Sequence, residues 1–430
     1  MTNTKNTSKN TTAAYEDQAV KGKPSAAEAV FGNIAKPMFS GKKATTPLKI
    51  ALTALLLVVL FVLPIYLQGM GEALLLASLV GIGLYVILAL GLNIVIGYAG
   101  MLDFGRMAFY AVGTYAAIIL AIPLANLLGP SLEGLVFPVV MVGAGLVAAF
   151  VGWLLSLPVM RLRGDYLAIV TLGFGEIVRI TLQNNPFDLT NGLLGLPKSG
   201  DFMPSPPFFE YLRDTVQWAI GNEFFFTVTR NVYWYYMVLI MLIIAIIVVR
   251  NQDNSRLGRS WAAMREDEVA ASAMGVNITK AKTWAFVLGA FWGGIAGACF
   301  GFFLGGISPE PFSFLNSVIV LAIVVIGGMG SIPGVLVGGV LIMGFPELIR
   351  WFAMNHLGQA GGDIQSMVAN FRNLFLGLLM VIMMAVRTEG LIPMKPKFYK
   401  LFGKAKSGKG DNSDASAATT GAAPKGGAGS

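Results

Sequence analysis

The chain has 430 residues, of which 55% are hydrophobic and only 13% are charged, and its mean hydropathy is +0.68. These values exclude an ordinary soluble domain and favour a polytopic membrane protein. The net charge of +8 comes from basic residues that cluster beside apolar segments. The positive-inside rule therefore explains this charge better than binding to nucleic acid does.

Ten apolar segments follow one another along the chain. A span needs about 20 apolar residues, and continuous apolar runs without period-two alternation indicate helices rather than a barrel. We therefore predict an all-α, polytopic helical membrane protein with about ten transmembrane helices. The predicted spans are 50–67, 73–96, 106–127, 135–158, 166–182, 232–249, 283–305, 316–329, 332–352 and 371–386.

The tails and loops follow from this count. The first 49 residues carry eight lysines and no apolar core, which excludes a cleavable signal peptide and favours the cytosol. Ten spans bring the C-terminus back to the same side. We predict disordered basic tails at 1–48 and 391–430 around a transmembrane domain at 49–390, with an outer loop at 183–231 and a cytosolic loop at 250–282.

Two glycine-rich stretches, 97–105 and 327–334, interrupt predicted helices, and their sequences VIGYAG and VIGGMG hint at an internal duplication. Broken helices and intramembrane polar residues often line a transport path. The three-residue spacing of Glu176 and Arg179 also allows a purely structural pair, and Asn93 also suits a hydrogen bond between helices. The path candidates are Asn93, Gly97, Gly100, Asp103, Glu176, Arg179, Gly327 and Gly330.

A second glycine pattern repeats every four residues within one predicted span, 283–305. Small residues let helix backbones approach closely in lipid, where no hydrophobic effect drives helices together. The stripe predicts close helix packing within the subunit, or alternatively a face between subunits or along the pore. Its members are Gly289, Gly293, Gly297, Gly301 and Gly305.

The segment 250–282 is a charged island of 33 residues, with six Lys/Arg and four Asp/Glu, between two apolar spans. Ser260 suits an N-cap, Trp261–Met274 a short helix, and Gly275 its stop, with a second short helix after Asn277. Alanines on such a helix permit close approach to a groove on another protein. A solvated interfacial helix is the alternative.

The core of this island, AAMREDEVAASAMGVN, resembles the cytosolic coupling loop of ABC-importer permeases. The stretches LGLNIVIGYAGMLDFGRMAFYAVGTYAA (90–117), RLRGDYLAIVTLGFGEIVRI (161–180) and AIVVIGGMGSIPGVLVGG (322–339) further resemble the LivM-type permease of branched-chain amino acid importers. The resemblance implies an ATPase-docking set: Ala263, Arg265, Glu266, Asp267, Ala270, Ala271, Met274 and Gly275.

The resemblance also implies a permease subunit in the bacterial cytoplasmic (inner) membrane. Its expected partners are ATPase subunits, a second permease, a periplasmic or lipid-anchored binding protein and membrane lipid. The chain has one cysteine and one histidine, and the glycine–lysine series at 403–410 lacks the closing Ser/Thr of a phosphate loop. We therefore expect no metal, no cofactor and no enzymatic activity, with ATP used by the partners. A urea or short-amide permease, and a secondary transporter or channel, are the alternatives.

Overall fold

The computed structural model describes the chain in segments, and these are the part of the protein discussed below. In that part the chain is helical, and its only bridge between extended segments pairs Leu196 with Ile307. The described residues are 59–68, 73–128, 133–160, 162, 164–185, 189–196, 230–356, 374–375, 377–383, 385 and 390–393.

The helices lie close to the predicted spans. The α-helices are α4 (Ala73–Asn93), α5 (Arg106–Leu128), α6 (Glu133–Val159), α7 (Asp165–Gln183), α9 (Arg230–Asp253), α10 (Arg256–Glu266), α11 (Glu268–Ala273), α12 (Ile278–Leu304), α13 (Phe314–Gly327), α14 (Ile332–Gly339) and α15 (Phe345–His356). Two π-helical turns, η1 (Ile94–Tyr98) and η7 (Val340–Gly344), and two 3₁₀ turns, η4 (Gly192–Leu194) and η6 (Glu310–Phe312), complete the set.

Five of the described helical segments are long and apolar enough to cross a membrane: Leu74–Tyr98, Val136–Val159, Asn231–Asp253, Ile278–Leu304 and Ile332–Phe352. Three shorter apolar helices are Val59–Gln68, Arg106–Ala121 and Phe314–Gly327. The chain is therefore a polytopic helical membrane protein. Helix α7 forms where a span was predicted but belongs to neither group, and it is the helix that carries Glu176 and Arg179.

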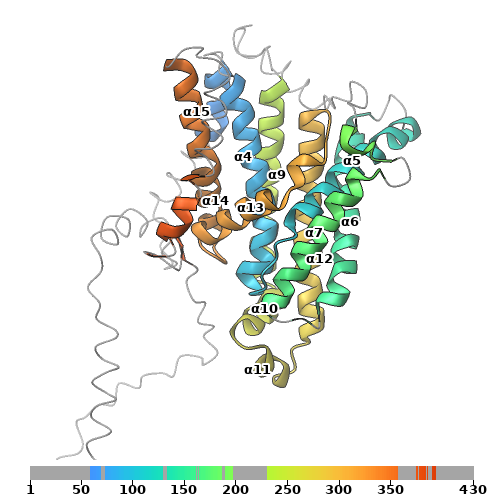
Figure 1. Ribbon diagram of the computed structural model, residues 1–430, viewed down its shortest axis with the longest axis vertical. Helices are drawn as coiled ribbons and strands as arrows, with labels where there is room; N and C mark the ends of the chain where they lie inside the picture. Colours follow the sequence, from blue (N-terminus) through green and yellow to red (C-terminus); the bar gives the residue numbers. More distant parts are fainter. Residues whose placement is uncertain are drawn as a thin grey trace, which may run out of the picture. The chain divides into compact units, whose positions relative to one another are not determined.

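Helix α12 occupies the centre of the packing. It lies against α4, α5 and α6 (Figure 1), and most of its residues between Ala281 and Gly301 are buried. Its glycines make this possible, because a methyl group added at Gly294 would lie 2.5 Å from the Cβ of Ala148 on α6. The core is thus built by backbones that approach one another closely, as small residues permit in membrane helices.

Both predicted breaks are present, with one shift. Helix α4 runs on through the π-turn η1, so Gly97 is still helical, and the irregular segment is 99–105. The second break separates α13 from α14, where Gly328 and Gly330 have φ of +120° and +84°. Ser331 caps α14 by accepting a hydrogen bond from the Gly334 N–H. Glycine is needed at both positive-φ positions because other residues rarely adopt that conformation.

Several expectations fall wholly or partly outside the described residues. These are the tails at 1–48 and 391–430 (of which only 391–393 are described), with the glycine–lysine series at 403–410, and much of the outer loop at 183–231. The predicted spans 50–67 and 371–386 are described in part, and both parts are helical. The number of ten spans therefore stays a prediction.

Candidate functional site

The charged island 250–282 contains two short helices, α10 and α11. They lie at the end of the bundle where α9 ends and α12 begins (Figure 1). Ser255 is the N-cap of α10, and its hydroxyl accepts a hydrogen bond from the Gly258 N–H. The expected cap, Ser260, lies inside α10 and donates to the Arg256 carbonyl. The prediction at Ser260 was wrong because the helix starts a turn earlier, where a serine was also available.

Asp267 divides the single helix that was expected over Trp261–Met274. Its backbone is extended, with φ of −157°, and its carboxylate accepts hydrogen bonds from the N–H groups of Val269 and Ala270. These bonds lower the pKa of the exposed Asp267 carboxyl group. The aspartate side chain ends α10 because it bonds to the first N–H groups of α11 and so caps that helix instead of continuing the first.

The end of α11 agrees with the prediction, whereas the helix after it is longer than predicted. Gly275 has φ of +85° and ends α11, as expected of a C-terminal glycine. The Asn277 side-chain oxygen then accepts a hydrogen bond from the Lys280 N–H and so caps a helix. This helix is α12, which continues to Leu304. The predicted second short helix is therefore the first turns of a long span.

Two polar contacts fix α10 and α11 to α12. The indole N–H of Trp261 donates to the Ala281 carbonyl at 2.8 Å, and Met264 beside it is buried. The Lys282 ammonium lies 2.7 Å from the Glu268 carboxylate and is almost fully buried. The apolar residues of α10 thus face the protein, which leaves the other face of the island exposed.

Seven of the proposed docking residues are exposed: Ala263, Arg265, Glu266, Asp267, Ala270, Met274 and Gly275. Ala271 is buried at 5% exposure and faces the protein, and the guanidinium of Arg265 reaches the chain's own backbone at Gly97. Val269 was not singled out from the sequence, yet it is 64% exposed on α11, near Met274 at 85%. The sequence signal that could have identified Val269 is Asp267, a helix-capping residue two positions earlier, which places Val269 in the first turn of a new helix.

The path candidates at the two breaks meet in space. The Asn93 side-chain oxygen accepts a hydrogen bond from the Gly330 N–H at 2.8 Å, so the expected interhelical role of Asn93 is present. A methyl group at Gly97 would lie 2.4 Å from the Gly330 nitrogen. One at Gly327 would lie 2.3 Å from the Gly334 carbonyl oxygen. These glycines are therefore required for backbone contact between α4, α13 and α14.

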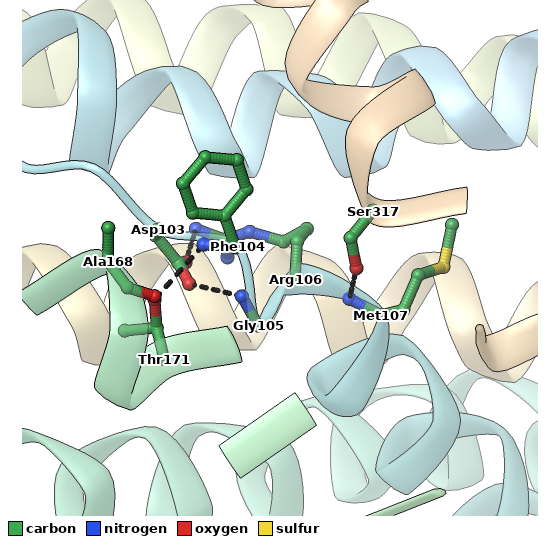
Figure 2. A network of polar contacts seen from close by, with 8 residues as sticks. All are labelled: Asp103, Phe104, Gly105, Arg106, Met107, Ala168, Thr171 and Ser317. Atoms are coloured by element: carbon green, nitrogen blue, oxygen red, sulfur yellow. Dashed lines mark hydrogen bonds and ion pairs between the residues drawn. The ribbon is translucent and has the colours of Figure 1, made fainter. Parts of the chain in front are cut away.

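Asp103 lies in a buried polar network at the start of α5 (Figure 2). One carboxylate oxygen accepts from the Gly105 N–H at 2.9 Å, and the other lies 2.9 Å from the Arg106 guanidinium, with both side chains fully buried. Thr171 on α7 accepts from the Phe104 N–H at 3.1 Å. Arg106 was not singled out, although the three-residue spacing that suggested the Glu176–Arg179 pair applies equally to it.

Ser317 completes this network from a distant part of the chain. Its hydroxyl oxygen, on α13, accepts a hydrogen bond from the Met107 N–H at 3.3 Å (Figure 2). The N-termini of α5 and α13 therefore meet. The Met107 N–H in the first turn of α5 thus finds its acceptor on a neighbouring element, as buried helix ends require.

Glu176 and Arg179 form the ion pair that their spacing allowed. Two hydrogen bonds from the Arg179 Nε to the carboxylate, at 3.0 and 3.1 Å, accompany the contact of its Nη2. The pair is partly exposed, at 37% for Glu176 and 25% for Arg179, whereas the Asp103 side chain is fully buried. The path candidates therefore lie in different surroundings, and Glu176 and Arg179 are satisfied by each other on the surface of α7.

The glycine stripe of α12 packs inside the chain. Gly289 faces Gly91 and the Arg106 guanidinium, while Gly293 faces Phe109. A methyl group at Gly297 would lie 2.1 Å from the Tyr110 carbonyl oxygen. Gly301 faces Thr114, and Gly305 lies beyond the helix as its C-cap, with φ of +73°. Gly305 was therefore wrongly assigned to the packing stripe.

Comparisons with known proteins agree with this architecture. A family model described as the permease component of branched-chain amino acid transport systems matches residues 74–384. The high-affinity branched-chain amino acid permease protein LivM of Salmonella typhimurium is 40% identical over 332 residues, which cover 75% of this chain and 71% of the relative. LivM of Escherichia coli is 38% identical over 334 residues, covering 76% and 72%.

A second kind of permease is also similar. LivH of Salmonella typhimurium is 28% identical over 269 residues, which cover 62% of this chain and 81% of the relative. No solved structure matches the chain.

Proposed function

The chain belongs to the permease family of branched-chain amino acid transport systems, and from this premise we propose that it carries leucine, isoleucine or valine across the bacterial cytoplasmic membrane. The observation that supports this substrate class is the match to LivM permeases over three quarters of the chain. The chain itself acts as a permease subunit. Energy comes from ATP that separate subunits hydrolyse.

The partners follow from the same premise. The similarity to both LivM and LivH favours a complex in which a second permease subunit stands beside this one. A binding protein delivers the amino acid from outside, and both termini and the island 250–282 lie in the cytosol. The basic residues at the island's ends support this orientation through the positive-inside rule.

Helices α10 and α11 are the proposed ATPase contact. Val269 and Met274 expose apolar side chains beside the charged residues Glu266 and Asp267. An exposed apolar edge with a polar rim is the usual composition of a docking surface. The buried side of the island, held by Trp261, gives this surface a fixed position.

Docking can be tested by placing charge on the exposed edge. We expect Val269→Asp and Met274→Asp to abolish capture of the ATPase subunits in a pull-down from detergent-solubilised membranes, because a carboxylate would be desolvated in the contact. Thr279→Asp, at an exposed position on the first turn of α12, is the matched control. Ala271→Glu is unsuitable, since Ala271 is buried. If both Val269→Asp and Met274→Asp still capture the ATPase subunits, docking at this edge is contradicted.

The substrate class needs a transport measurement. The complete complex in proteoliposomes is expected to accumulate labelled leucine, isoleucine and valine only when ATP is supplied to the ATPase side. Labelled urea serves as the comparison substrate. Uptake of urea but not of leucine would replace the proposed substrate, and leucine uptake by the purified chain alone under an ion gradient would replace the mechanism.

A further inference from the structure

Arg265 differs from the charged residues that follow it. It lies in the last turn of α10, and its guanidinium donates a hydrogen bond to the Gly97 carbonyl, which is 168 residues away in the sequence. Helix α10 packs against the π-turn η1 that contains Gly97. Arg265 is exposed, as are the next two residues, Glu266 and Asp267, but its guanidinium reaches back to the chain's own backbone. Arg265 therefore connects the island to the first break.

The Gly97 carbonyl suits this contact because it stands at the end of a helix. The last carbonyls of a helix have no partner within it, and the helix dipole places negative charge there. The Met101 N–H, which could have reached Gly97, bonds instead to the Val95 carbonyl at 3.0 Å. A cationic guanidinium is thus both a donor and a favourable charge at this position.

Gly100 keeps the space that the Arg265 side chain occupies. A methyl group at Gly100 would lie 2.9 Å from the Arg265 Cγ. The φ of Gly100 is +72°, so the backbone there also favours glycine. The aliphatic part of Arg265 is therefore held against the break while its head group caps the helix.

The second break continues the connection. Gly97 lies against Gly330, and the Gly330 N–H donates to the Asn93 side chain one turn before Gly97. These contacts leave no room for a side chain at Gly97. Displacement of the Gly97 carbonyl must therefore displace Gly330 as well, because closely packed backbones transmit movement rather than absorb it.

We propose that Arg265 is a positioning residue that transmits movement of the island to both broken helices, through the Gly97 carbonyl and Gly330. This proposal rests on the proposed function, since it assumes that ATPase subunits move α10 and α11. It changes the role of Arg265 from an ATPase contact to an internal link. The residues that contact the ATPase, such as Val269 and Met274, then differ from Arg265, the residue that passes the movement of the island on to the broken helices.

The first test separates coupling from docking in the complete reconstituted complex. Arg265→Met retains ATPase capture and ATP hydrolysis, while labelled leucine transported per ATP falls at least about tenfold, as loss of one charged hydrogen bond allows. Arg265→Lys restores part of the ratio, because an ammonium group also donates to a carbonyl. Arg259→Met, at an exposed position on the same helix, leaves the ratio unchanged. An unchanged ratio in Arg265→Met, or loss of ATPase capture, overturns the proposal.

The second test needs neither ATPase nor transport. Hydrogen exchange of the purified chain is measured for the peptide that contains Gly330. Arg265→Met increases exchange at the Gly330 N–H, and Arg259→Met does not. Unchanged exchange overturns the link whatever the transport result. Increased exchange in a chain that never captures an ATPase means that the link stands and the proposed function fails.

Discussion

The pair Asp103–Arg106 shows how single residues are held in this protein. Two opposite charges are fully buried 2.9 Å apart, where each is stable only because the other is present. Asp103 also accepts the Gly105 N–H, and Arg106 lies over the Phe109 ring at 5.5 Å. The sequence marks Asp103 as unusual because of its apolar setting. The three-residue spacing to Arg106 allows the pair, and the turn before α5 brings the two charges together.

Removing one member of the pair is expected to lower the free energy of unfolding strongly, and removing both is expected to lower it much less. Arg106→Met leaves the Asp103 carboxylate buried without a counter-charge and lowers the free energy of unfolding by about 3–5 kcal/mol. Asp103→Asn combined with Arg106→Met restores most of the loss, because asparagine still accepts from the Gly105 N–H. Thermal unfolding of the purified chain in detergent measures both. Equal melting temperatures for the wild type and Arg106→Met would contradict a structural pair.

At the scale of the element, α12 depends on backbone contact rather than on side-chain interlocking. The Thr114 hydroxyl donates to the Gly297 carbonyl at 2.9 Å, which requires α5 and α12 to lie close together. The sequence predicts this stripe from its four-residue period. It does not say which helix faces the stripe, and the structure places α4 and α5 there.

The packing of α12 is tested by the smallest possible addition. Gly297→Ala is expected to lower the melting temperature and the yield of monodisperse protein, because its methyl group would lie 2.1 Å from the Tyr110 carbonyl oxygen. The size of the loss should be typical of overpacking, about 1–3 kcal/mol. Gly81→Ala on α4 is the control, since nothing lies within 4 Å of its added methyl group. A loss in Gly81→Ala comparable to that in Gly297→Ala would contradict the contact explanation, because alanine by itself favours the helix more than glycine does.

The island 250–282 has one face that packs against the protein and one face that is exposed. Trp261 and Glu268 attach α10 and α11 to α12, and Val269 and Met274 remain exposed. The sequence identified the island by its charge and located its glycine stop correctly. It could not divide inward from outward alanines, because Ala270 and Ala271 are chemically identical and only the fold distinguishes them.

At the scale of the whole molecule, the two breaks are the feature that joins distant parts of the chain. The echo between VIGYAG and VIGGMG extends to the backbone, since Gly100 and Gly330 occupy matching places and both have positive φ. Gly97 and Gly330 are in contact although 233 positions separate their numbers. The described part of the chain thus brings the ends of three helices, α4, α10 and α13, to one place.

From the sequence alone follow the class of the protein, the places where its described helices form, its two breaks and its charged island. These are local properties: apolar length, glycine spacing and charge act on neighbours in the chain, so their pattern can be read there. The tertiary structure alone decided that Ala271 is buried and that Arg265 reaches Gly97. Those outcomes depend on which helices pack together, and a burial or a hydrogen bond across 168 residues leaves no local pattern to read.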